Sequence, residues 1–463
     1  MGQFDLIIIG GGSAAFSAAI RANEIKLDTL LINGGLPLGG TCVNVGCVPS
    51  KFIIRAAESI YHSSYSAFEG ISPKGVDVDF KKIIQQKKKL VAEMQQKKYL
   101  DLLNDLEHVE VVEGIASFQD KNTINVNGRE FKGLKIIIAT GSTTAIPPIE
   151  GLENISYLTN DTLFDLEELP KSLAVIGGGY IGLEIAQAYN RFGSKVTVIE
   201  MADRILSTET KDITDELTKH LKNEGIEIIT NSSVKSVEQE KENVKVNLDD
   251  QIVYFTHLLI ATGRKANTEN LGLENIGIDA AKKGFIQVND KLETKIQNIY
   301  AIGDVNTFPQ FVYTAAYEGG IAVGNAFQGA EQKVDYSSLP WVVFTDPQIA
   351  GVGMDENEAK EKNIPFETTN LALTEIPRSI AALDTRGFIK LIRNPETDLL
   401  LGARIIAPEG SELAMELSLI IKYRIKVKEI ISTIHPYLTL SEGIRLAAMS
   451  FTTDLKKMSC CAS

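Results

Sequence analysis

The stretches DLIIIGGGSAAF (residues 5–16) and SLAVIGGGYIGLE (residues 172–184) decide the fold of this chain. In each, a short apolar run precedes three glycines and a segment of small or helix-favouring residues comes after them. A second β-rich run comes next, at 29–32 and at 195–200. Strand, glycine turn, helix and parallel strand together form a mononucleotide-binding unit. Two such units predict an α/β protein that binds two dinucleotides.

The first glycine turn reads G-x-G-x-x-A, over Gly10, Gly12 and Ala15. Its glycines let the backbone approach a pyrophosphate at the helix N-terminus, and the small third residue lets the helix pack close to the strand. Its second strand ends at Asn33 instead of the usual acid, and Asn33 can bond a ribose hydroxyl without charge. Taken alone, this motif fits a plain strand–helix connection equally well.

The second glycine turn is a complete G-x-G-x-x-G motif. Its residues are expected to hold a nicotinamide dinucleotide: Gly177, Gly179, Tyr180, Ile181 and Gly182. The next strand ends at Glu200, whose carboxylate would accept a hydrogen bond from a free ribose 2′-hydroxyl and repel a 2′-phosphate. NADH is therefore favoured over NADPH, although Arg204 could soften that choice. The alternative for Glu200 is a solvated charge at a strand end.

Three further β-runs end in turns where a bound cofactor would lie. They are ATGS at 139–142, ATGR at 261–264 and IYAIGDV at 299–305. The backbone positions expected at a cofactor are Ala139, Thr140, Gly141 and Gly263. Asp304 offers a carboxylate to the ribityl or phosphate-bridging groups of a flavin, or it caps the helix after it.

Length and charge exclude several classes of function. The 463 residues suffice for two to four domains. The net charge of −13 disfavours nucleic acid and anionic membranes as partners. The apolar run before the first glycines is too short for a signal peptide or a membrane span, and no later run is long enough. A cytoplasmic enzyme is expected.

All four cysteines come in pairs. Cys42 and Cys47 lie in GGTCVNVGCVPSK (residues 39–51), ahead of an expected helical stretch, and Cys460 and Cys461 are adjacent near the C-terminus. In a reducing cytosol the first pair is expected to be redox-active, ahead of a structural disulfide, and a zinc site would need two more nearby ligands. Thiolates prefer soft cations, so the terminal pair indicates a soft-metal clamp, with an incidental dipeptide as the alternative.

These motifs, in this order over essentially the whole chain, resemble the FAD-dependent pyridine nucleotide-disulfide oxidoreductases, and within them the mercuric reductases. The resemblance implies a homodimer with two Rossmann-like domains and a C-terminal α+β dimerisation domain. The predicted domains are FAD-binding at 1–145 and 265–335, NAD(P)H-binding at 146–264, and interface at 336–463 with the cysteine tail. Electrons would pass from NADH or NADPH through FAD to the Cys42/Cys47 pair.

The resemblance also implies roles for residues around that pair. Cys47 would lie against the flavin, Cys42 would face the substrate, and Lys51 would pair with Glu184. Gly40, Thr41 and Lys51 would contact FAD. Tyr99 matches a second tyrosine that lines the mercuric reductase pocket; taken alone it is an ordinary amphipathic helix residue.

The segment HPYLTLSEG (residues 435–443) separates two branches of the family. Relatives that exchange dithiols carry a histidine five residues before a glutamate, and this dyad moves protons to the leaving thiol. Five residues before Glu442 stands Tyr437, while His435 is two positions away and is expected to be a hydrogen-bonded loop residue. The general base is therefore expected to be absent, which suits a cationic substrate. Tyr437 is assigned to the metal site, with interface packing as its alternative.

Mercury(II) reduction is therefore the predicted activity. Cys460 and Cys461 of one subunit would hand Hg(II) to Cys42 and Cys47 of the other. Dihydrolipoamide dehydrogenase, or another flavin disulfide reductase, is the first alternative, and a non-catalytic soft-metal-binding flavoprotein is the second.

Overall fold

The computed structural model describes residues 2–455, and its first sheet has seven strands. Their order is β3-β2-β1-β6-β5-β4, with β16 beside β6. The first four strands of that order and β16 are parallel, whereas β4 and β5 form antiparallel pairs with their neighbours. The strands are β1 (Gly2–Ile9), β2 (Thr29–Asn33), β3 (Val109–Glu113), β4 (Ala116–Asp120), β5 (Thr123–Val126), β6 (Arg129–Ile138) and β16 (Ile299–Ala301).

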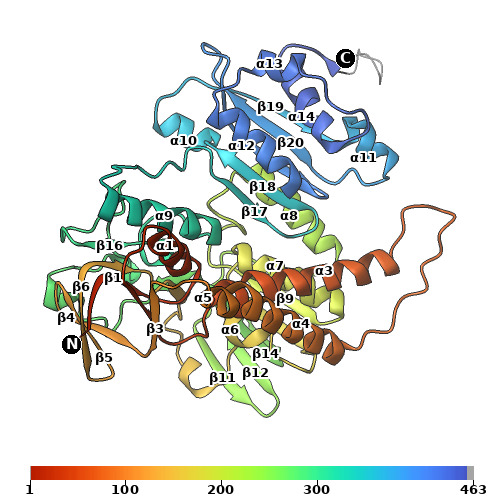
Figure 1. Cartoon of the computed structure of the whole chain (residues 1–463). Coiled ribbons are helices and arrows are strands. Elements are labelled where there is room, and N and C mark those ends of the chain that lie inside the picture. Colours follow the sequence, from red (N-terminus) through yellow and green to blue (C-terminus); the bar gives the residue numbers. More distant parts are fainter. Residues whose placement is uncertain (1, 456–463) are drawn as a thin grey trace.

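Helix α1 (Ser13–Glu24) starts directly at the first glycine turn, as the sequence predicts. It packs against α9 (Val312–Gln328), which comes from a much later part of the chain (Figure 1). Small side chains allow this close contact: a Cβ at Gly319 of α9 would lie only 2.8 Å from the carbonyl oxygen of Ala14. The two distant segments therefore complete one layer over the first sheet.

The second sheet is parallel, in the order β10-β9-β8-β14. Its strands are β8 (Ser172–Ile176), β9 (Lys195–Ile199), β10 (Glu227–Ile229) and β14 (His257–Ile260). Helices α7 (Tyr180–Phe192) and α8 (Lys211–Asn223) connect them, and α6 (Asn160–Leu163) precedes them. Three antiparallel strands accompany this sheet: β11 (Ser236–Glu240), β12 (Asn243–Asn247) and β13 (Ile252–Phe255). Strands β7 (Ser142–Thr144) and β15 (Arg264–Ala266) pair where the chain enters and leaves this region.

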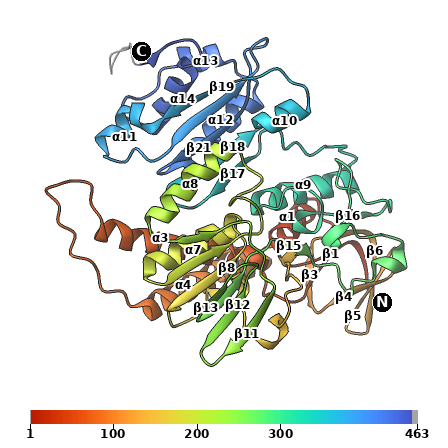
Figure 2. The ribbon, with the colours of Figure 1, turned by 180° about the vertical axis from the view of Figure 1, so that it is seen from behind.

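The C-terminal part forms an antiparallel five-stranded sheet with helices, an α+β arrangement (Figure 2). Its order is β17-β18-β21-β20-β19. The strands are β17 (Pro340–Val343), β18 (Gln348–Gly353), β19 (Glu367–Ala372), β20 (Phe388–Arg393) and β21 (Leu400–Ala407). The helices are α10 (Glu356–Glu361), α11 (Pro377–Ala381), α12 (Ala414–Lys422), α13 (Val427–Ser432) and α14 (Leu440–Met449).

A helical hairpin carries the first cysteine pair. It consists of α2 (Gly40–Asn44), α3 (Cys47–Ser64) and α4 (Phe80–Gln95), which continues through a π-helical turn at Gln96–Leu100 into α5 (Asp101–Leu103). The connection between α3 and α4 projects from the body in both views (Figures 1 and 2). The hairpin fixes the orientation of the segment that begins at Cys47.

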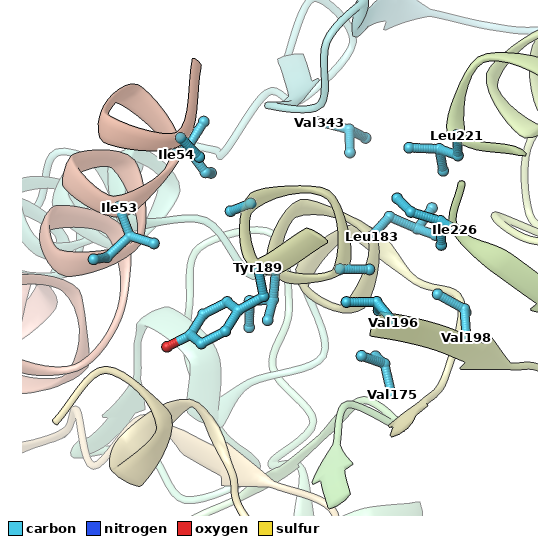
Figure 3. Close-up of a cluster of buried hydrophobic side chains, with 14 of the residues drawn as sticks. Ile53, Ile54, Val175, Leu183, Tyr189, Val196, Val198, Leu221, Ile226 and Val343 are labelled. Carbon is cyan, nitrogen blue, oxygen red and sulfur yellow. The ribbon is translucent and has the colours of Figure 1, made fainter. Parts of the chain in front are cut away.

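One buried apolar cluster joins the hairpin to the second sheet and the C-terminal sheet (Figure 3). Ile53 of α3 and Leu183 of α7 belong to it, as do Val196 of β9 and Val343 of β17, and each is at most 1 % exposed. The start of α3 is therefore held against α7 by a core that crosses three parts of the molecule.

No helix between residues 2 and 455 combines the length and the apolar content needed to cross a bilayer. The fold class is the one the sequence predicts, with two sheets that each contain a parallel glycine-turn unit and with a C-terminal α+β part. The domain boundaries stay a prediction.

Candidate active site

Residues of both glycine turns and both cysteines of the first pair line one cavity of about 1280 Å³. The predicted site residues that line it are Gly12, Thr41, Cys42, Cys47, Lys51, Ala139, Gly141, Gly177, Gly179, Tyr180, Ile181, Glu184, Glu200, Gly263 and Asp304. The predicted residues that do not line it are Gly10, Ala15, Asn33, Gly40, Tyr99, Thr140, Gly182 and Tyr437.

The first two positions of the first glycine turn, Gly10 and Gly11, have no room for side chains. Gly10 has φ +131°, and a Cβ there would meet the carbonyl oxygen of Ala139 at 2.2 Å. A Cβ at Gly40 would meet Gly12 Cα at 2.8 Å, so the dithiol segment also presses its backbone against this turn. Ala15, the third residue of α1, is completely buried. The result is a bare backbone cradle at a helix N-terminus, which suits a pyrophosphate.

The residues around this cradle fit a flavin dinucleotide. Thr140 Oγ1 is buried and lacks a hydrogen-bond partner among residues 2–455, although it lies between the cavity-lining residues Ala139 and Gly141. A buried hydroxyl without a partner is unfavourable by itself, and a bound polar ligand would satisfy it.

Asp304 is held at the cavity by two residues. Ser142 Oγ donates to its carboxylate at 3.0 Å, and Arg264 Nε lies 3.7 Å from it. Burial raises the pKa of Asp304, while Arg264 and Ser142 oppose that rise. The helix-cap alternative for Asp304 is wrong, because Asp304 sits in a 3₁₀ turn and α9 begins only at Val312.

Asn33 ends β2 beneath the first glycine turn and is 5 % exposed. Its Nδ2 donates to both carboxylate oxygens of Glu113, at 3.0 and 3.2 Å, and to the carbonyl of Leu36 at 3.3 Å. Sequence reasoning did not find Glu113. It ends β3 and belongs to no motif, so only its registration opposite Asn33 identifies it.

Cys42 lies within α2, and Cys47 is the first residue of α3. Cys42 therefore precedes α3, the helical stretch that contains Lys51, as expected, whereas Cys47 is the first residue of that helix instead of preceding it. The hydrogen bond between the two sulfurs raises the pKa of Cys42, and burial raises it further. The same hydrogen bond, helped by the positive charge of Lys51 and opposed by burial, lowers the pKa of Cys47 to about 7. Cys47 is thus the thiolate near neutral pH, and Cys42 is the thiol that donates to it.

Lys51 lies one turn into α3 and forms an ion pair with Glu184 of α7, with Nζ 2.7 Å from Oε2. The other Glu184 oxygen accepts a hydrogen bond from the backbone N–H of Phe344 at 2.9 Å. The Phe344 ring centroid lies 4.5 Å from Lys51 Nζ. Phe344 is the first residue of the stretch FTDPQIAGVG (residues 344–353) and is not among the predicted site residues. Three parts of the chain therefore orient one cation beside the cysteine pair.

The second glycine turn repeats the first cradle. Gly177 has φ +109°, and a Cβ at Gly182 would meet the Gly177 carbonyl oxygen at 2.2 Å. Glu200 accepts from the backbone N–H of Gly178 at 2.7 Å and of Ala202 at 2.8 Å, so both of its oxygens are fixed by the turn.

The surroundings of that turn give Arg204 and Tyr180 definite partners. The terminal nitrogens of Arg204 donate to Asp203 and to the carbonyl of Ser207, while its buried Nε has no hydrogen-bond partner among residues 2–455. Tyr180 stacks on Trp341 with ring centroids 5.6 Å apart, and burial raises the pKa of Tyr180. Tyr180 thus lines the cavity with its ring fixed by stacking.

Tyr99 lies in the π-helical turn, outside the cavity lining. Its ring packs edge-on against Phe16 at 4.8 Å and against the backbone of Gly39. Burial raises the pKa of Tyr99.

Tyr437 lies in the C-terminal part and is 48 % exposed. The Glu442 carboxylate accepts from the N–H of Leu438 at 3.2 Å, which fixes the turn that carries Tyr437. His435 bonds Glu416 at 2.9 Å and the carbonyl of Thr433 at 3.0 Å, which confirms the expectation of a hydrogen-bonded loop histidine. Cys460 and Cys461 lie outside the described residues.

Comparison with known families defines the class. Residues 4–319 match the model described as "Pyridine nucleotide-disulphide oxidoreductase". Residues 339–448 match "Pyridine nucleotide-disulphide oxidoreductase, dimerisation domain". The chain therefore belongs to the pyridine nucleotide-disulphide oxidoreductase family and is an FAD-dependent oxidoreductase.

Similar proteins include several mercuric reductases. The chain is 41 % identical to the mercuric reductase of Lysinibacillus sphaericus, over 99 % of this chain and 85 % of that protein. It is 39 % identical to that of Streptomyces lividans, over 99 % and 98 %. Among solved structures, the Cu(II) complex of the HOCl-induced flavoprotein disulfide reductase RclA from Escherichia coli matches with a TM-score of 0.89 at 30 % identity, over 98 % of this chain and 100 % of that one.

Proposed function

We propose that this chain is a mercury(II) reductase. The overall reaction is NAD(P)H + Hg(II) → NAD(P)⁺ + Hg(0) + H⁺, in which the hydride supplies both electrons that the metal accepts. The observation that carries this proposal is the Cys42/Cys47 pair, with its neighbouring Lys51–Glu184 ion pair, in a cavity that both glycine turns line. The similarity to mercuric reductases over 98 to 100 % of the chain supports the choice of metal.

The residues around each turn would hold one cofactor. For FAD we propose Gly10, Gly12, Ala15, Asn33, Gly40, Thr41, Lys51, Ala139, Thr140, Gly141 and Asp304. For NAD(P)H we propose Gly177, Gly179, Tyr180, Ile181, Gly182, Glu200 and Gly263. When bound, FAD would supply the two-electron chemistry that links the nicotinamide to the dithiol. The locally bonded Arg204 and the fixed carboxylate of Glu200 favour NADH as donor.

Within the dithiol the two sulfurs have different tasks. Because its pKa is lowered to about 7, a large fraction of Cys47 is thiolate at neutral pH and can ligate Hg(II) without first losing a proton. Cys42 must release its proton when it becomes the second thiolate ligand, so binding of the metal by both sulfurs liberates a proton. Lys51 offsets part of the negative charge of the pair, and Glu184 with Phe344 holds that cation in place.

Tyr437 supports a metal substrate over a disulfide. A dithiol-exchanging relative needs a base that takes up a proton and returns it to the leaving thiolate, and a phenol with an ordinary pKa near 10 is a poor base at neutral pH. We propose that Tyr437 and Tyr99 line the path of Hg(II). We further propose a cytoplasmic homodimer, with the domain boundaries predicted above, in which Cys460 and Cys461 of one subunit deliver Hg(II) to the dithiol of the other.

The deciding experiment monitors the absorbance of NADH with the holoenzyme and excess small thiol. HgCl₂ with NADH, dihydrolipoamide with NAD⁺, and a Cu(II) salt with NADH are offered separately. We expect oxidation that depends on HgCl₂ and release of elemental mercury vapour, both lost in Cys42→Ser. Lipoamide turnover without mercury-dependent oxidation, or oxidation that depends only on Cu(II), would exclude the proposal.

The delivery role of the tail has its own test. We expect the double variant Cys460→Ala and Cys461→Ala to lose most mercury turnover when thiols are scarce and to regain it when they are in excess. Unchanged turnover under both conditions would show that the tail does not deliver the metal.

A further inference from the structure

The carboxylate that should stand at the end of β2 is missing, and the structure places another beside that position. In a Rossmann unit the strand-end acid accepts a hydrogen bond from the ribose 2′-hydroxyl. Here that position is Asn33, and Glu113 pairs with it in the parallel register between β2 and β3. The two side chains make two hydrogen bonds, of 3.0 and 3.2 Å.

These bonds fix the orientation of the Asn33 amide. Nδ2 is used by Glu113 and Leu36, and the carbonyl Oδ1 faces the glycine turn, where a Cβ at Gly11 would lie 2.1 Å from it. Glu200 shows a matching arrangement in the second turn, where one carboxylate oxygen faces Gly178. Asn33 therefore reproduces the oxygen that faces the turn, but its other polar atom is a donor where Glu200 has an acceptor.

Glu113 restores that acceptor. Its carboxylate lies directly beyond Nδ2, at the same carboxyl edge of the parallel sheet, and the end of β3 is exposed. Within residues 2–455 no lysine, arginine or histidine forms an ion pair with Glu113, so its charge is available to a ligand. A charged acceptor binds a hydroxyl about twice as strongly as a neutral one.

We propose that Glu113, positioned by Asn33, is the ribose-binding acid for the adenosine of FAD, supplied by β3 instead of β2. This inference rests on the proposed placement of FAD at the first glycine turn. If so, Asn33 and Glu113 need only one negative charge between them, and this charge can stand at the end of either β2 or β3.

The test measures FAD binding to the full-length apoprotein by quenching of flavin fluorescence. The probes are FAD and an analogue whose adenosine ribose lacks the 2′-hydroxyl. The variants are Glu113→Gln, the exchange Asn33→Asp with Glu113→Gln, and Glu110→Gln as a control on the same strand with an exposed carboxylate that does not bond Asn33. Glu113→Gln keeps the shape of the side chain and removes its charge.

We expect the Kd for FAD to rise about tenfold in Glu113→Gln and to stay within about twofold of the wild type in Glu110→Gln. The exchange variant reverses donor and acceptor between the two side chains and should recover wild-type affinity within about threefold. The wild type should prefer FAD over the 2′-deoxy analogue about tenfold, and Glu113→Gln should lose that preference.

Two results would overturn the role of Glu113 while leaving the FAD site in place. One is unchanged FAD affinity in Glu113→Gln. The other is an equal loss of affinity for FAD and for the deoxy analogue, which would indicate a merely structural residue. Wild-type apoprotein that fails to bind FAD would instead refute the placement of the cofactor.

Discussion

The first glycine turn, at Gly10–Gly12, and the second, at Gly177–Gly179, have nearly the same backbone. Their first glycines have φ of +131° and +109°, and their last have φ/ψ of −93°/−171° and −83°/−177°. They differ in the helix that each turn begins. Helix α1 is covered by α9 and carries small buried residues, whereas α7 carries Glu184 to the cysteine pair. The strand-end acid is also present only in the second unit, as Glu200.

The same glycine-turn backbone therefore serves two tasks in this molecule. At the first turn, α1 packs closely against α9, and the acid proposed for the ribose, Glu113, comes from the neighbouring strand β3. The second turn continues into a helix that reaches the redox centre. The same motif therefore predicts a phosphate site in both places, but only the surrounding packing shows which helix contributes to chemistry.

The largest effect is expected from Gly10→Ala and Gly177→Ala. Each new Cβ would lie 2.2 or 2.5 Å from a carbonyl oxygen, in a backbone conformation that costs a side chain about 1–3 kcal/mol. Gly10→Ala should purify almost without FAD, measured by flavin absorbance, whereas Gly177→Ala should keep FAD and show a KM for NADH raised at least about tenfold.

Gly128→Ala is the matched control for backbone strain alone, because Gly128 has φ +82° and no atom within 4 Å of a Cβ. It should keep both FAD and the KM for NADH. Full flavin content in Gly10→Ala would contradict the assignment of the first turn to FAD.

Helix α7 contacts the dithiol region through the ion pair between Glu184 and Lys51 of α3. The variant Lys51→Met tests what this cation does for the dithiol. Loss of the cation should raise the pKa of Cys47 above about 7 but not to its ordinary value of 9.0, because the hydrogen bond from Cys42 is the larger cause of the lowered pKa and remains. As the pH falls, the thiolate should therefore be lost at a higher pH than in the wild type. Thiolate absorbance of the reduced apoprotein, recorded between pH 5 and pH 10, measures this. Arg55→Met, farther along α3 and paired with Glu58, should leave the titration unchanged. An unshifted curve in Lys51→Met would show that Lys51 does not stabilise the thiolate.

The acid of the second turn is tested by Glu200→Gln. Loss of its charge should raise the KM for NADH about five- to tenfold and bring the ratio of kcat/KM for NADH over NADPH closer to one. Glu242→Gln, in the exposed turn between β11 and β12, is the control. A variant that keeps its full preference for NADH would assign the selectivity to other residues.

The smallest effect concerns the third position of the motif. Ala15 is fully buried in α1, and Ala15→Gly should reduce the free energy of unfolding by about 1 kcal/mol without changing the flavin content. Thermal unfolding of the holoenzyme measures this. A loss of FAD in this variant would mean that Ala15 does more than pack the helix.

Much of the fold could be predicted from local patterns in the sequence. The strands and helices of both glycine-turn units appear where the alternation of apolar runs, glycines and small residues predicts them, because such short-range patterns fix local structure. The ion pair between Lys51 and Glu184 was expected only through family resemblance, since 133 residues separate its members.

The missed features depend on tertiary contacts. Glu113 is an ordinary exposed glutamate in sequence, and only strand register places it beside Asn33. Phe344 reaches the site because the core in Figure 3 draws β17 against α7. The helix-cap interpretation of Asp304 failed because the chain inserts a further segment before α9, which no local signal marks.

The apolar cluster shared by α3, α7 and β17 bears on whether the predicted NAD(P)H-binding domain can fold on its own. Residues 146–264, the predicted NAD(P)H-binding domain, contain the parallel second sheet, but Ile53, Ile54 and Val343 from outside this range cover part of its apolar interior. Produced alone, residues 146–264 would expose this apolar surface to water and would tend to self-associate. If these residues occurred as a domain of another protein, other apolar side chains would have to take the place of Ile53, Ile54 and Val343.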